Sequence, residues 1–368
     1  MAFALPVWLV VQEELLQNGA DDCRTPSCFD EYDDETLFQV FHLTRTCITF
    51  ITDSIRRRMK TVTVENVDLS VDAMVMVALN YYAQGVSSPV VLDRVGLTTT
   101  ESASYIVATV SGIIVGMSDQ FILFPRTRDA RGKVAYQFER LGGIPHVVGI
   151  LAPAHFKIRA SPYEKSSFRS FVNSQGYTSV VSQIICDSEG NILSVDKCCV
   201  GSTFEQEMWE SSSQGKDIEK QFNWLVGGKG YHLSSHILTP LSDPVSDGEI
   251  RFNVAHEKIL DIMRTTLGSM KRRFRCLMQL GFAQEATLHR KCNIIKACSV
   301  LHNIAKKFSV PPPPAAGKIE PLHPGKQHSV PVEICPEAVK ARQKIIDEVF
   351  SSGSSSQEPP GDNITEEE

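Results

Sequence analysis

The chain has 368 residues, of which 42% are apolar and 22% charged, a composition that excludes disorder throughout and predicts a folded protein of one to three domains. Ten cysteines are too few for a disulfide scaffold, no stretch approaches 18 apolar residues, and no secretory signal opens the chain. We therefore expect no membrane span and a reducing, intracellular location. The formal net charge is −6, but nine acids and one base lie in residues 1–35, and five acids and no base lie in residues 351–368. The remaining 36–350 carries 36 bases and 29 acids, a net charge of +7, so charge does not exclude a nucleic-acid partner.

The segment after the acidic start is predicted to be helical. Apolar residues at helical spacing indicate a helix over 36–60, and an N-cap at Ser70 indicates another that ends near Gly85. A further helix follows a glycine turn, where Thr98 and Glu101 have the spacing of a capping box. This succession has the outline of a helix-turn-helix. Its last helix lacks Lys, Arg, Asn and Gln, so we expect little sequence-specific contact with base edges.

Basic residues gather in short clusters, of which two are candidates for DNA contact and a third lies at 289–291. Their charge suits non-specific contact with phosphates, and the first cluster also suits nuclear import. The competing interpretation, which stays open, is a solvated helix surface with no ligand. The candidate DNA-binding residues are Arg56, Arg57, Arg58, Lys60, Lys271, Arg272, Arg273 and Arg275.

After Gly142 the residue pattern becomes typical of β-strands. An apolar run at 145–151 predicts a buried strand, and apolar segments on both sides of the turn at 188–191 predict a hairpin. The elements expected are strands at 145–151, 177–187, 192–200 and 222–227, and helices at 205–219, 249–277 and 287–307. We divide the chain into an acidic segment (1–35), a helical, helix-turn-helix-like domain (36–140), an α/β domain (141–308), a Pro-rich linker (309–335), a short helix (336–350) and a disordered acidic tail (351–368).

The order of strand, hairpin, strand and long helix is that of an RNase H-like nuclease core, and specific motifs support it. These motifs follow one another at the intervals of the PIF/Harbinger transposase family, which includes vertebrate harbinger transposase-derived nucleases. The chain resembles this family over roughly residues 1–310. This resemblance implies a DDE-type α/β fold with a mixed sheet and flanking helices, preceded by the helical domain. The motifs are Pro145-His-Val-Val-Gly149, Trp224-Leu-Val-Gly227, Asn253-Val-Ala-His256, Arg272-Arg-Phe-Arg-Cys-Leu277 and Leu301-His-Asn303.

The resemblance also implies a site for phosphodiester cleavage, which can be checked residue by residue. In the family an Asp, an Asp and a Glu hold two divalent cations about 4 Å apart, which activate water and stabilise the leaving oxygen. The corresponding positions here are Ala152, Gly228 and Arg264. The first two side chains cannot bind metal, and Arg264 places a permanent positive charge where two dications would lie. The sequence therefore predicts a degenerate DDE domain.

Nearby acids offer a possible substitute for the missing triad. Asp261 lies three residues before Arg264, Glu257 a further turn away, and Glu205 at the place of an auxiliary family acid. Our interpretation is that Asp261 and Glu257 are surface residues, with Asp261 paired to Arg264 at i,i+3. The alternative hypothesis is a DNA endonuclease that uses these displaced acids and Mg²⁺ or Mn²⁺. His155, His256 and His302 are predicted to be structural, since no carboxylate cluster remains for them to join.

The function expected from the sequence is that of a domesticated, catalytically inactive transposase relative. We expect it in the nucleus, with the cytoplasm as a second location, as a DNA- or protein-binding module that needs no cofactor or metal. The family resemblance implies a Myb-like nuclear partner, because Harbinger transposases act with a separate Myb-like protein that supplies DNA recognition. The oligomeric state is left open.

Overall fold

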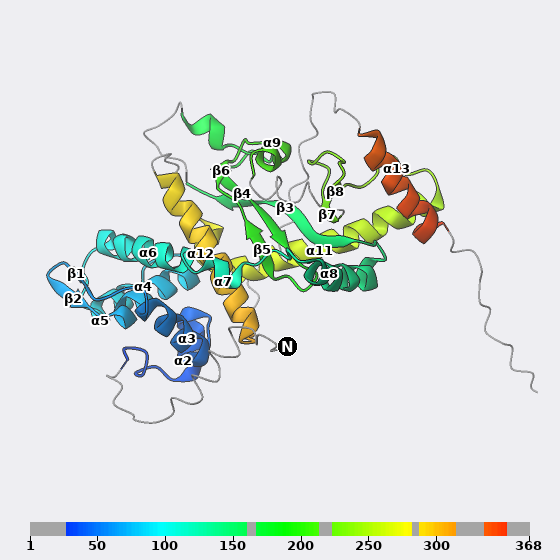
Figure 1. Ribbon diagram of the computed structural model, residues 1–368. Coiled ribbons are helices and arrows are strands. Elements are labelled where there is room, and N and C mark those ends of the chain that lie inside the picture. The colour runs from blue at the N-terminus through cyan, green and yellow to red at the C-terminus, as the bar shows by residue number, and fades with distance from the viewer. Residues whose placement is uncertain (1–26, 160–166, 213–222, 282–286, 314–334, 352–368) are drawn as a thin grey trace, which may run out of the picture.

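The N-terminal part of the chain is helical, and it leads into a sheet with helices on both sides (Figure 1). The computed structural model describes residues 27–159, 167–212, 223–281, 287–313 and 335–351. The elements of the first part are α2 (Asp34–Phe41), α3 (Arg45–Arg56), β1 (Val62–Val64), β2 (Val67–Leu69), α4 (Val71–Gln84), α5 (Pro89–Arg94), α6 (Thr100–Val115), α7 (Ser118–Phe121) and α8 (Arg128–Gly142).

Local signals explain where these helices begin and end. The Ser70 hydroxyl accepts a hydrogen bond from the Ala73 N–H at 3.2 Å, and α4 ends at Gly85, whose φ of 80° suits a residue without a Cβ. The helix predicted over 36–60 is in fact two helices, α2 and α3. The chain turns between them because His42 adopts a left-handed conformation, with φ at 56°, and its N–H closes on the carbonyl of Phe38.

The cap of α6 also differs from the prediction. Thr99, one residue after the predicted Thr98, is the N-cap and accepts from the N–H of Ser102. The acid that completes the cap comes from the turn between β1 and β2. The Glu65 carboxylate accepts from the N–H groups of Thr98 and Thr99, at 2.9 Å and 3.2 Å. A residue 33 positions away thus holds the start of this helix.

The sheet has six strands, and its order is β5-β4-β3-β7-β8, with β6 paired to β4. The β3–β4 and β4–β5 pairs are antiparallel, whereas β3–β7 and β7–β8 are parallel. This mixed sheet with flanking helices has the architecture of an RNase H-like core, as predicted. Its elements are β3 (Val147–Lys157), the 3₁₀ turn η1 (Ser167–Phe171), β4 (Ser179–Cys186), β5 (Ile192–Val195), β6 (Cys199–Val200), α9 (Glu205–Glu210), β7 (Trp224–Gly227), β8 (Ile237–Leu238), α11 (Asp247–Arg273), the 3₁₀ turn η2 (Arg275–Met278) and α12 (Leu288–Lys307).

The two faces of β3 contribute to two cores. Ile150 and Ala152 pack in the main core, which also includes buried side chains of α2 to α6, α11 and α12. Val148 and Leu151 pack with Trp209 of α9 in a smaller core. The main core therefore joins residues of both predicted domains, and α12 contacts both α6 and β5.

The C-terminal described segment, α13 (Pro336–Ile345) with the π-helical turn η4 (Ile346–Phe350), lies against the start of α11 (Figure 1). Arg251 of α11 donates from Nε to the Phe350 carbonyl at 2.8 Å, and the rings of Phe252 and Phe350 make an edge contact at 5.8 Å. Arg342 donates to the carbonyl of Thr239 at 3.0 Å. The predicted short helix is thus docked on the α/β part. In the part of the chain that the structure describes, no helix has the length and apolarity needed to cross a membrane.

Candidate active site

The adjacent parallel strands β3 and β7 position the first two triad equivalents. Leu151 pairs with Gly227 in the register, and Ala152 and Gly228 are the next residues along the chain, with Gly228 directly after the end of β7. Ala152 is 3% exposed and belongs to the main core. At Gly228 a Cβ would meet no other atom within 4 Å. Neither residue has a side chain that could bind metal.

The third equivalent, Arg264, lies in the middle of α11. His256, eight residues before Arg264 on α11, donates from Nε2 to the Leu238 carbonyl at 3.1 Å and lies beside the backbone of Gly227. Lys271, which follows Arg264 on the same helix, donates to the His155 carbonyl at 3.1 Å. These two contacts fix α11 across β7, β8 and β3, with Arg264 between them. Arg264 itself is only partly buried, with 31% of its side chain exposed.

The charges around Arg264 differ from those of a metal site. Its guanidinium forms an ion pair with Glu257 at 2.9 Å and a second with Asp261, the predicted i,i+3 pair. The two carboxylates are 63% and 56% exposed, and Arg264 is 31% exposed. The acids nearest to the triad position are therefore paired with the residue that replaced the glutamate.

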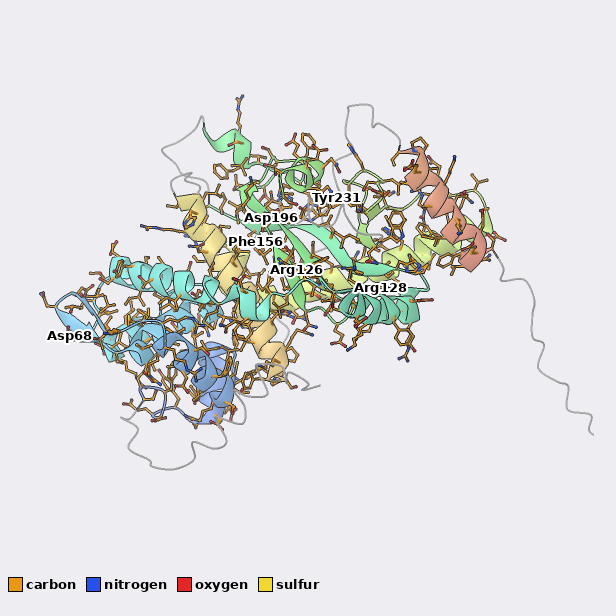
Figure 2. All side chains as sticks on the ribbon, in the orientation of Figure 1. Asp68, Arg126, Arg128, Phe156, Asp196 and Tyr231 are labelled. Carbon is orange, nitrogen blue, oxygen red and sulfur yellow. The ribbon has the colours of Figure 1, made fainter. Side chains whose placement is uncertain are left out.

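Glu205 does not join these acids. It is the first residue of α9, is 6% exposed, and lies near Tyr231, whose pKa is raised by burial and by the Glu205 charge. Tyr231 lies on the α9 side of the sheet, whereas α11 covers the other face (Figures 1 and 2). Over the described ranges, no three His, Cys, Asp or Glu side chains gather as metal ligands would. The residues present there do not fit a two-metal site.

The three histidines predicted to be structural make buried hydrogen bonds. His155 bonds to the Ser179 hydroxyl at 2.9 Å, and His302 donates to the Gly190 carbonyl at 3.0 Å. Burial lowers the pKa of His256 and of His302 to about 4. Both are therefore neutral at pH 7 and connect helices to the sheet.

The structure separates the candidate DNA-binding residues into different environments. Arg56 forms ion pairs with Asp53 and Asp72, while Arg57, Arg58 and Lys60 are exposed after the end of α3. Lys271 and Arg272 are half-buried and Arg275 is exposed.

Arg273 is the exception among these candidates, because it is a core residue. It is 4% exposed and donates to the carbonyls of His42, Val310 and Pro311 at 2.6 Å, 3.0 Å and 3.0 Å. The expectation that it lies on a DNA-binding surface is corrected, since a guanidinium surrounded by these carbonyls cannot reach a phosphate.

One basic surface was missed at the sequence level. Arg126 and Arg128 lie at the start of α8 (Figure 2), and Arg131, Lys133 and Arg140 follow along the helix. The signal was present as five bases and two acids within residues 126–142. It was obscured because these bases are spaced out rather than adjacent.

The comparisons with known proteins agree with this architecture. Residues 154–303 match the family described as DDE superfamily endonuclease. The protein named Putative nuclease HARBI1 is 29% identical over 353 residues in Rattus norvegicus, and 28% identical over 354 residues in Bos taurus and in Homo sapiens. Each match covers 95% of this chain and 100% of the relative. No solved structure matches the chain. The mixed sheet and the match over residues 154–303 are those of a DDE superfamily endonuclease domain, and the chain as a whole is similar to the harbinger-derived putative nucleases.

Proposed function

We propose that this chain is a catalytically inactive member of its family that acts in the nucleus as a DNA- or protein-binding module. The observation that carries the proposal is the set of residues at the three ligand positions. Ala152 and Gly228 offer no oxygen, and Arg264 offers a cation where the family uses a carboxylate. Mg²⁺ and Mn²⁺ need carboxylate and carbonyl oxygens, and a fixed positive charge repels them.

The displaced acids do not make up for this loss. Asp261 and Glu257 are both paired with Arg264, so a metal ion would have to compete with a guanidinium that is already in place. Glu205 is part of the opposite side of the sheet. The fold has kept the buried contacts that build it, such as those of His256 and His302, which supports a role that needs the scaffold without the reaction.

The competing function is a divalent-metal-dependent endonuclease, as the printed names of the relatives suggest for those proteins. The two functions are distinguished by incubating the full-length protein with supercoiled plasmid and either Mg²⁺ or Mn²⁺. We expect no conversion to open-circular or linear DNA above that of a protein-free sample. Asp261→Ala is compared with Asp119→Ala, which removes an exposed acid on α7 that has the same charge. Cleavage that Asp261→Ala abolishes and Asp119→Ala leaves intact would overturn the proposal.

Location and partner form a separate part of the proposal. The exposed Arg57, Arg58 and Lys60 support nuclear import. Helix α6, which lacks Lys, Arg, Asn and Gln for contact with base edges, supports a Myb-like partner that supplies sequence recognition, as in the family. A fluorescent fusion should accumulate in the nucleus and lose part of that accumulation when the three residues are replaced by Gln. A fusion excluded from the nucleus would contradict this part.

A further inference from the structure

The surface of α8 carries a spaced array of bases. Ala135 and Phe138 are its buried positions. Lys133, Tyr136 and Arg140 are spaced by three and four residues, so at 100° per residue they lie together on the side opposite the buried positions. Each of the three is exposed, Tyr136 by 62%. α8 therefore presents a basic stripe with an aromatic side chain in it to solvent.

The bases of this surface are not neutralised. Among the residues that the structure describes, no Asp or Glu oxygen lies within 4.0 Å of a nitrogen of Arg126, Arg128, Lys133 or Arg140. Arg140 instead lies over the Tyr136 ring, 6.0 Å from its centroid. This contrasts with Arg56 and Arg264, each of which has two carboxylate partners.

The acids of the same surface leave it net positive. Asp129 and Glu139 are the acids of α8, and Glu189 approaches it through a hydrogen bond with Gln137 at 3.3 Å. With Arg126, Arg131 and the other bases, residues 126–142 carry five bases and two acids, a net charge of +3.

The helix is also held rigidly. Thr127 caps its start by accepting from the Ala130 N–H at 3.2 Å, and it ends at Gly143, whose φ is 75°. Its C-terminal end lies against α11, where a Cβ at Gly142 would come within 2.8 Å of Ile259. The bases therefore have defined relative positions, unlike those at 57–60, which lie beyond the last turn of α3.

We propose that the exposed face of α8 is the surface that binds double-stranded DNA, through its phosphate backbone. This inference rests on the DNA-binding branch of the proposed function and assigns it to a site. From Lys133 to Arg140 the axis of the helix spans about 10.5 Å, which matches about three phosphates of one strand at 3.4 Å per base pair. Arg128, exposed in the first turn, lies about 120° around the helix from Arg140 and extends the basic surface at its start. The proposal concerns the phosphate backbone, because Arg and Lys bind phosphate oxygens whatever the base sequence is. Tyr136 provides a flat, amphipathic contact between the charged groups.

The test compares two triple variants of the full chain that remove the same charge. In one, Arg128, Lys133 and Arg140 are replaced by Gln, and in the control the exposed Lys258, Lys340 and Lys344 are replaced by Gln. Binding to a fluorescent 30-base-pair duplex is measured by anisotropy from 50 to 200 mM salt, and thermal denaturation checks that both variants fold. Three lost phosphate contacts should lower the slope of log K against log salt by about 2.7. The affinity of the wild type should therefore fall about 40-fold more across this range than that of the α8 variant, and the control should follow the wild type.

The possible outcomes separate this inference from the proposed function. If the wild type binds and the α8 variant binds equally well, or if both variants lose the same affinity, the assignment to α8 is overturned while DNA binding stands. If the wild type does not bind duplex DNA at 50 mM salt, both the assignment and the DNA-binding branch are overturned, and the protein-binding branch remains. Metal-dependent cleavage of the duplex would instead overturn catalytic inactivity, independently of which helix binds.

Discussion

Replacing Arg273 tests whether a basic residue in a family motif serves structure or DNA contact. Its guanidinium joins three separate segments: the turn after α2 through His42, the end of α11 that carries it, and the segment after α12 through Val310 and Pro311. His42 returns the contact by donating from Nδ1 to the Arg273 carbonyl at 2.8 Å. We therefore expect Arg273→Met to destabilise the fold.

The magnitude follows from two opposing contributions. Three hydrogen bonds from a charged donor contribute about 1.5 to 3 kcal/mol each, or about 4.5 to 9 kcal/mol in total. Burial opposes this, since it lowers the pKa of Arg273 from 12.5 to about 10, which corresponds to about 3 kcal/mol against the charged form. The difference is about 1.5 to 6 kcal/mol, and the expected loss in the free energy of unfolding is about 3 kcal/mol.

Urea denaturation of Arg273→Met, of Arg273→Lys and of Arg275→Met measures this loss. Arg275→Met is the matched control, because Arg275 is exposed, has the same charge and lies two residues away. It should change the free energy of unfolding by less than about 0.5 kcal/mol. Arg273→Lys should recover only part of the loss, since an ammonium group cannot reproduce the planar fork of donors. If Arg273→Met unfolds at the wild-type urea concentration but binds DNA more weakly, the structural role assigned to this residue is wrong.

Two further predictions concern the pH dependence of stability and the room for a Cβ atom at two glycines. His256 and His302 have pKa values of about 4 in the folded state and about 6.5 when unfolded, so as the pH falls below 6.5 protons bind the unfolded state first. Stability should be complete above pH 6.5 and fall by about 1.4 kcal/mol per pH unit for each histidine down to about pH 4. In urea titrations His302→Gln should make this slope shallower, and a stability that is flat between pH 6.5 and 5 would contradict the assignment. Gly228→Ala should be neutral within about 0.5 kcal/mol, whereas Gly201→Ala, whose Cβ would lie 2.4 Å from the Ser179 hydroxyl, should cost about 3 kcal/mol. Equal melting temperatures for the two alanine variants would refute this comparison.

Local patterns predicted most elements of the fold because their causes lie within a few residues. The cap at Ser70 and the Gly85 stop predicted α4, and apolar segments on both sides of a turn predicted the hairpin of β4 and β5. The errors arose where a distant residue decides the outcome. Glu65 accepts from the N–H of Thr99 at the start of α6 from 34 positions away. The left-handed His42, which divides the first predicted helix, bonds through its ring to the Arg273 carbonyl 231 residues away.

Part of the candidate site could also be predicted from the sequence, because the identity of a residue limits the chemistry that it can perform. An alanine, a glycine and an arginine cannot bind two dications in any fold, so Ala152, Gly228 and Arg264 already excluded a complete triad at the positions that the family uses. The sequence could not show whether neighbouring acids replace it. That depended on where α11 lies on the sheet and on which face α9 covers, which separates Glu205 from Asp261.

Charge is the property for which sequence and structure differ most. The sequence contains the bases and their spacing, and it showed that the acids collect at the two ends of the chain. Only the tertiary structure decides the environment of each base: Arg273 is buried against carbonyls 37, 38 and 231 residues away, Arg264 is paired, and Lys133 and Arg140 remain exposed. The physical reason is that the energy of a charge depends on its solvation and on its nearest partners, and both are set by which segments the fold brings together.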